Sequence, residues 1–129
     1  LLIFFLCTFI FLEQIQTSQN FSISRNDQKF IIKTAQAVPS KCQVFYINSE
    51  LTSTPQAFIQ NDAFLISQIS GIPTLNGYSG VYPKNWNLNS IGDPSYLMRI
   101  DEYVKTQQIT KNTCELNISM SKWYLRVYP

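Results

Sequence analysis

Residues 42–75 read CQVFYINSELTSTPQAFIQNDAFLISQISGIPTL, and this stretch decides the fold. It begins with a short β-branched and aromatic run, residues 42–47, which lies between polar segments and predicts a largely buried strand. Apolar residues then recur at helical spacing over residues 56–70, and the pattern ends at Gly71. Residues 73–75 return to strand character. A strand–helix–strand unit of this kind predicts two neighbouring parallel strands.

Helical and strand patterns continue on both sides of this unit. Residues 25–37 (RNDQKFIIKTAQA) predict a first amphipathic helix, and residues 95–108 predict a third helix. Residues 114–120 alternate in polarity and are followed by WYLRVY at 123–128, which predicts a closing antiparallel hairpin through residues 121–122. The order predicts a small α/β domain of two or three layers, with a short mixed, partly parallel sheet.

The composition fits one domain and excludes several kinds of partner. The chain has 129 residues, with 10 basic and 8 acidic side chains that are scattered rather than clustered, so we expect no binding to nucleic acid. It has no histidine and no Cys-x-x-Cys pair. We therefore predict no metal site, and nothing in the sequence indicates a cofactor.

The amino-terminal residues 1–12, LLIFFLCTFIFL, carry no charge. A helix of this length spans about 18 Å, which is short of the roughly 30 Å of a bilayer core. We interpret residues 1–16 as the end of a truncated transmembrane helix, and residues 17–129 as an extracytoplasmic α/β domain. The hydrophobic region of a signal peptide is the alternative. A buried helix of a soluble protein is disfavoured because the run has no polar face.

The three cysteines fall into two groups by their sequence surroundings. Cys7 lies in the apolar run, whereas Cys42 and Cys114 each open a stretch of strand character. In an extracytoplasmic domain, a Cys42–Cys114 disulfide would close a long loop and stabilise the fold by about 4 kcal/mol. The alternative is a pair of buried free thiols.

Residues 72–86, IPTLNGYSGVYPKNW, combine two prolines, two glycines and three large aromatic side chains. This segment follows a predicted strand, at the end of the sheet where α/β domains usually bind ligands. Aromatic faces suit sugar rings, and amides and carboxylates suit sugar hydroxyls. The candidate ligand-binding residues are Asp62, Asn76, Tyr78, Tyr82 and Trp86.

Each of these candidates also has a structural interpretation. Tyr78 and Trp86 would brace the segment against the core of the domain or against a membrane surface. Asp62 would stabilise the start of its helix. Asn76 and Gly77 form a strong turn dipeptide.

The sequence predicts no catalytic residue. Residues 77–81 (GYSGV) depart from the G-x-S-x-G nucleophile motif at Val81, and the chain has no histidine to act as the base. Asp101 and Glu102 are adjacent on a predicted helix and point in different directions, so they do not form a two-carboxylate glycosidase site. A small soluble enzyme would need a base and a nucleophile that the sequence does not provide.

The combination of Asn61-Asp62-Ala63, GIPTLNGYSG at residues 71–80, Pro83 and Trp86 resembles the extracytoplasmic carboxyl-terminal portion of bacterial polytopic membrane glycosyltransferases of the GT-C type. The resemblance covers about residues 37–123. It implies a domain on the periplasmic or extracellular side of a membrane, held there by an amino-terminal helix.

For function, the resemblance implies a non-catalytic domain that assists recognition of an acceptor, a glycan or a lipid-linked sugar. The catalytic acid of such transferases lies in an early loop that this chain does not contain, so we expect these residues alone to be inactive. The alternative function is a secreted or anchored module that binds carbohydrate or protein.

Overall fold

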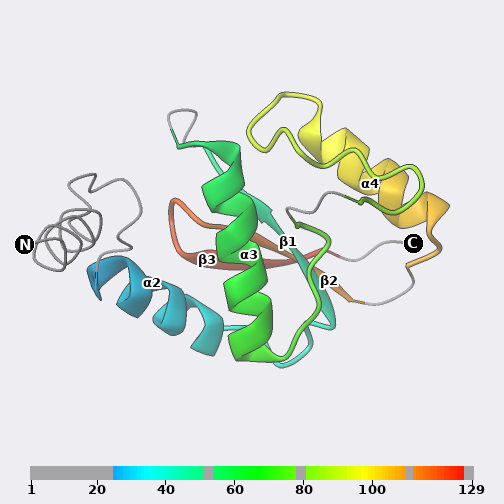
Figure 1. Cartoon of the computed structure of the whole chain (residues 1–129). Helices are drawn as coiled ribbons and strands as arrows, with labels where there is room; N and C mark the ends of the chain where they lie inside the picture. The colour runs from blue at the N-terminus through cyan, green and yellow to red at the C-terminus, as the bar shows by residue number, and fades with distance from the viewer. Residues whose placement is uncertain (1–24, 51–53, 78–80, 110–111, 127–129) are drawn as a thin grey trace, which may run out of the picture.

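A computed structural model describes residues 25–50, 54–77, 81–109 and 112–126 (Figure 1). Its elements, in chain order, are α2 (Arg25–Gln36), β1 (Val44–Asn48), α3 (Gln56–Ser70), α4 (Tyr96–Thr106), β2 (Thr113–Asn117) and β3 (Lys122–Arg126). The three predicted helices and the small mixed α/β architecture are confirmed. The segment interpreted as a membrane helix, residues 1–16, lies outside the described residues. Within the described ranges, every helix is too short or too polar to cross a membrane.

The sheet has the order β1-β2-β3 and is mixed, as predicted. β1 and β2 pair in parallel from Val44 opposite Thr113 onward, whereas β2 and β3 are antiparallel. The hairpin turn lies slightly earlier than predicted, at residues 118–121, because Lys122 already pairs with Asn117.

Residues 73–75 lie beside β1, as expected, but they do not form a strand. They make one parallel bridge, between Phe45 and Thr74, with the Phe45 amide donating to the Pro73 carbonyl at 3.0 Å. Two residues further along the same edge of β1, the Ile47 amide donates to the Asn76 side-chain oxygen at 2.6 Å. A side chain therefore takes the place of the next backbone acceptor, and the ladder ends. The full parallel partner of β1 is β2.

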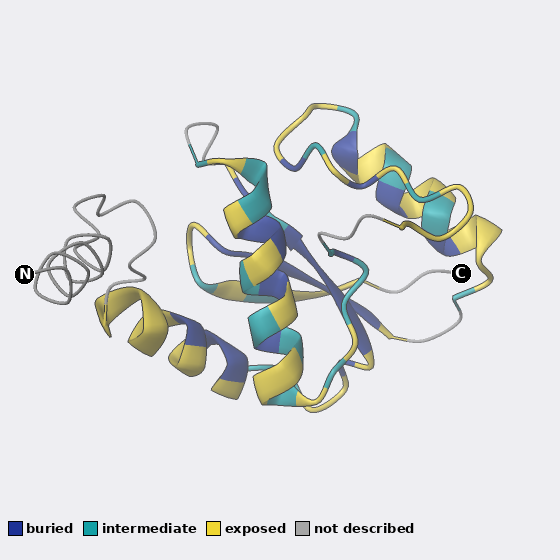
Figure 2. Cartoon of the chain, viewed as in Figure 1, coloured by how far each residue is buried: buried dark blue, intermediate teal, exposed yellow. Residues whose placement is uncertain are grey.

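The two faces of the sheet carry different helices. Phe45 packs edge-on against Trp123, with the ring centroids 5.3 Å apart. The Trp123 indole also donates to the Thr34 carbonyl of α2 at 3.1 Å. Tyr46 points to the opposite face, because successive strand residues alternate, and it meets Tyr96 in the first turn of α4. Figure 2 shows buried residues on all three helices and along β1 and β2, whereas β3 is largely exposed.

A disulfide joins Cys42, just before β1, to Cys114 in β2, which confirms the predicted bridge. The two Cα atoms are 5.8 Å apart and the residues are separated by 72 positions. Both cysteines are buried. The bond therefore links the outer strand β1 to the central strand β2.

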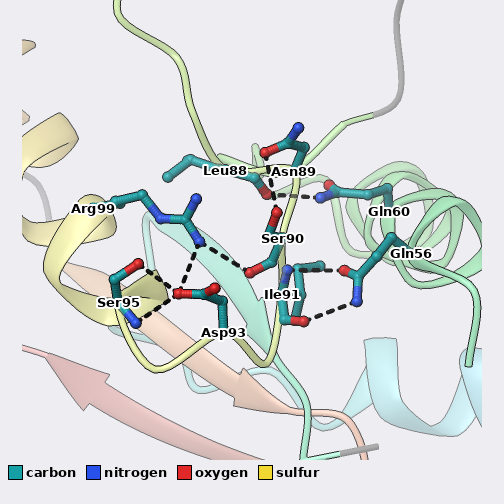
Figure 3. A network of polar contacts seen from close by, with 9 residues as sticks. All are labelled: Gln56, Gln60, Leu88, Asn89, Ser90, Ile91, Asp93, Ser95 and Arg99. Carbon is teal, nitrogen blue, oxygen red and sulfur yellow. Dashed lines mark hydrogen bonds and ion pairs between the residues drawn. The ribbon is translucent and has the colours of Figure 1, made fainter. Parts of the chain in front are cut away.

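α3 begins and ends where the sequence predicts. Gly71 follows it with φ 73° and donates its amide to the Ser67 carbonyl at 2.9 Å, in the left-handed conformation that glycine adopts most readily. Two glutamine side chains of α3 hold the segment that leads to α4 (Figure 3). Gln56 bonds both the amide and the carbonyl of Ile91, and Gln60 donates to the Leu88 carbonyl, each at 2.8 Å.

Candidate functional site

A cavity of about 580 Å³ opens between α2 and α3. We call it the α2–α3 groove. Its apolar lining comes from both helices and from the turn after β2: Phe30, Ile31, Ile32, Ile59, Leu65, Ile69 and Ile118. Three of these isoleucines are buried in its floor, whereas others on the two helices remain 40–47% exposed. The groove is thus an open, largely apolar surface of ordinary ligand-pocket size.

The spacing of residues on α3 explains why the groove forms. Ile59, Asp62, Leu65 and Ile69 follow each other at intervals of three, three and four positions, so they share one stripe of the helix. α2 and α3 pack against each other, as Figure 1 also shows. The apolar residues of the two helices that this packing does not cover remain open to solvent and line the groove.

The groove reaches the carboxyl ends of the two parallel strands. Ser49 follows β1, and Ile118 and Ser119 follow β2, and all three line the cavity. The Ser49 and Ser119 hydroxyls lie 3.3 Å apart. This is the position in which open α/β sheets generally bind ligands.

Two carboxylates, Asp62 and Asp27, line the same groove. Burial, and secondly the charge of Asp27, raise the pKa of Asp62 from its ordinary 3.8 to about 6. Asp62 lies in the second turn of α3, beyond the first turn in which acids stabilise helix starts. The structure therefore places a carboxylate of altered acidity in an apolar groove, with a second carboxylate close enough to act on it.

Asn76, another predicted ligand residue, is buried and engaged within the fold. Its side-chain oxygen accepts from the Ile47 amide at 2.6 Å, and its side-chain nitrogen donates to the Tyr96 hydroxyl at 2.9 Å. That hydroxyl in turn donates to the Ile47 carbonyl. Asn76 thus links residues 72–86, which we call the aromatic segment, to β1 and α4.

Tyr82 and Trp86 lie together with Asn76 around a smaller cavity of about 200 Å³. Their rings are stacked, with centroids 4.2 Å apart and an angle of 3° between the ring planes. The Trp86 indole donates to the Leu75 carbonyl at 2.9 Å. Each ring therefore covers one face of the other, and the indole ties the segment to its own backbone.

The four predicted ligand residues that the structure describes line two different cavities. Asn76, Tyr82 and Trp86 gather at the smaller cavity, whereas Asp62 lines the α2–α3 groove. Tyr78 lies outside the described residues. Sequence reasoning missed the groove itself, although one signal was present: Ile59, Leu65 and Ile69 recur at helical spacing on α3, and all three line the groove.

The buried Glu115 in β2 was also missed. Its carboxylate accepts hydrogen bonds from the Tyr46 hydroxyl at 3.1 Å, the Asn48 amide at 2.8 Å and the Arg126 guanidinium at 2.8 Å. The Glu115 carboxylate raises the pKa of Arg126. Because three donors from the two neighbouring strands, β1 and β3, satisfy the carboxylate, we assign Glu115 a structural role in the sheet.

In the part of the chain that the structure describes, no three side chains of the metal-binding types gather into a cluster. A scan against protein-family models and searches of curated proteins and of solved structures find no match to this chain. The resemblance to GT-C glycosyltransferases therefore stays a prediction from the sequence. The α2–α3 groove is the candidate site that the geometry supports best.

Proposed function

We propose that this chain is a non-catalytic, extracytoplasmic binding domain whose α2–α3 groove takes the apolar part of an amphiphilic ligand. The groove carries the proposal, since it combines ligand-pocket size, an apolar floor and two carboxylates at one place. The Cys42–Cys114 disulfide supports an oxidising location outside the cytoplasm.

The exposed side chains of the groove support an apolar ligand. Phe30, Ile32 and Ile69 are 40%, 45% and 47% exposed, and they lie around one cavity. Covering apolar surface of this kind is favourable by roughly 25 cal/mol for each Å² removed from water. A ligand with an apolar body would gain this free energy without any change in the fold.

The groove favours recognition of the apolar part of a ligand over recognition of its sugar. Tyr82 and Trp86 were expected to offer faces to a sugar, but they stack on each other, which favours their role as a brace. The groove suits an apolar chain better than a sugar ring. Attachment to a membrane transferase remains compatible with this proposal, and so does an independent secreted or anchored module.

Binding of the neutral apolar dye N-phenyl-1-naphthylamine tests this function. We expect saturable binding with one dye for each protein molecule. Ile69→Asn replaces an exposed apolar contact in the groove with a polar one, and we expect it to weaken binding about tenfold. Phe64→Asn is the matched control, because Phe64 is an exposed apolar residue of the same helix outside the groove.

Two results would contradict the proposal. One is the absence of saturable dye binding by the folded wild-type protein. The other is an equal loss of affinity in the Ile69 and Phe64 variants, which would place the dye on general apolar surface. Circular dichroism of each variant checks that it is folded.

A further inference from the structure

We propose that the natural ligand of the α2–α3 groove is a long-chain primary amine, whose ammonium group is held by Asp62 and Asp27. This inference rests on the proposed function, because it assigns the head group of a ligand whose apolar chain lies in the same groove. The ligand is a small amphiphile, because an open groove of about 580 Å³ is of the size that takes one small molecule.

The charge of the groove carries the inference. Two aspartates line it, and none of the described lining residues is a lysine or an arginine. Asp27 acts on Asp62 through its charge, so the two carboxylates lie within electrostatic reach of each other. Among the described lining residues they are also the only titratable groups. A cation near both carboxylates would offset the effect of the Asp27 charge on Asp62.

Partial burial makes Asp62 selective between charged head groups. A carboxylate that is removed from water loses hydration, and this loss is recovered when an opposite charge comes close. An ammonium group supplies that charge together with three hydrogen-bond donors. Ser49 and Ser119 add hydroxyl oxygens to the lining as further acceptors. A phosphate or carboxylate head would instead add a third negative charge.

The relevant protonation states overlap near neutral pH. The pKa of Asp62 is about 6, so its carboxylate is mainly ionised above this value. An alkyl ammonium stays charged up to about pH 10, as lysine does. The attraction is therefore present from about pH 7 to 9, and it weakens as Asp62 takes up a proton at pH 5.

Competition against N-phenyl-1-naphthylamine with three probes of equal chain length tests the inference. The probes are decylamine, 1-decanol and decanoate. At pH 7.5 we expect decylamine to bind about five- to tenfold more tightly than 1-decanol, and decanoate to bind more weakly than both. At pH 5 the advantage of the amine over the alcohol should shrink.

Asp62→Asn keeps the size of the side chain and removes its charge. We expect this variant to lose most of the preference for decylamine over 1-decanol at pH 7.5, because only the charge of Asp27 remains in the groove. The change in that preference between pH 5 and pH 7.5 should largely vanish. Glu102→Gln is the matched control, because Glu102 is an exposed carboxylate on α4 that does not line the groove, and it should keep the preference for the amine.

The outcomes separate this inference from the function on which it rests. If the dye binds and decylamine shows no advantage over 1-decanol, or if Asp62→Asn retains that advantage undiminished, the amine assignment is overturned and the groove still binds apolar ligands. If the dye and all three probes fail to bind, the proposed function itself fails. Displacement of the dye by a basic amphipathic peptide but by no alkyl amine would also overturn the amine assignment.

Discussion

Asp62 is the residue that distinguishes the groove from an ordinary gap between two helices. An apolar residue at this position would complete the stripe formed by Ile59, Leu65 and Ile69 and would pack without any loss of hydration. The chain instead has a carboxylate there, half-buried and close to Asp27. Such an arrangement costs stability in the free protein, and that cost is expected where a residue serves binding rather than folding.

We predict that Asp62→Asn stabilises the protein at neutral pH. The pKa of Asp62 is raised to about 6 in the fold, so between pH 4 and 6 the folded state binds more protons than the unfolded state. The free energy of unfolding therefore falls as pH rises through this window. Because Asp62 is only partly buried, we expect a gain of about 1 kcal/mol for the variant at pH 7.5.

Urea denaturation at pH 7.5 and at pH 4 measures this effect. The difference between Asp62→Asn and wild type should be present at the higher pH and should largely vanish at the lower one. A variant that is less stable than wild type at pH 7.5 would mean that Asp62 has a stabilising partner in the fold.

α3 shows what a pattern of residues reveals about an element and what it leaves out. Its limits were predictable because apolar spacing runs over residues 56–70 and Gly71 is able to adopt the positive φ that ends the helix. The groove was not predictable in the same way. Periodicity identifies an apolar stripe, but only the packing of α2 against α3 decides how much of that stripe stays open.

The aromatic segment differs from α3, because its unusual composition is plain in the sequence, whereas its described contacts lie mainly within the fold. Asn76, Tyr82 and Trp86 line one small cavity. The sequence did not reveal that Tyr82 and Trp86 stack on each other, or that Asn76 bonds Ile47 and Tyr96. Those contacts depend on residues far apart in the chain, which local pattern does not report.

We predict that Trp86→Phe destabilises the protein and leaves ligand binding intact. Phenylalanine retains an aromatic ring for Tyr82 and loses the indole donor to the Leu75 carbonyl, a hydrogen bond of 2.9 Å. The expected loss is about 1 kcal/mol, measured by urea denaturation. Unchanged stability with lost dye binding would show instead that the aromatic segment is the ligand site.

At the scale of the whole molecule, the mixed sheet was predictable from element order, but the partner of β1 was not. The strand–helix–strand pattern pointed to residues 73–75, which make a single bridge. β2 pairs with β1 along all five residues of the strand, although some 70 positions separate them. The Cys42–Cys114 disulfide spans a similar separation, 72 positions, and links β2 to the residues just before β1.

We predict that the double variant Cys42→Ser, Cys114→Ser loses about 4 kcal/mol of stability, because a 72-residue separation leaves a long loop free in the unfolded chain. Thermal unfolding followed by circular dichroism measures the loss. A reducing agent should lower the melting temperature of wild type and have no effect on the double variant. Equal melting temperatures of the two proteins under oxidising conditions would contradict a stabilising role of the bridge.

The most direct test of the α2–α3 groove as a ligand site is nuclear magnetic resonance of isoleucine- and leucine-methyl-labelled protein titrated with decylamine. We predict intermolecular nuclear Overhauser effects from the alkyl chain to the methyl groups of Ile59, Leu65 and Ile69, which line the groove on α3. Leu97 and Leu125, exposed on α4 and β3, should show none. Contacts confined to those two leucines, or saturation without any contact to the groove methyl groups, would contradict the assignment of the site.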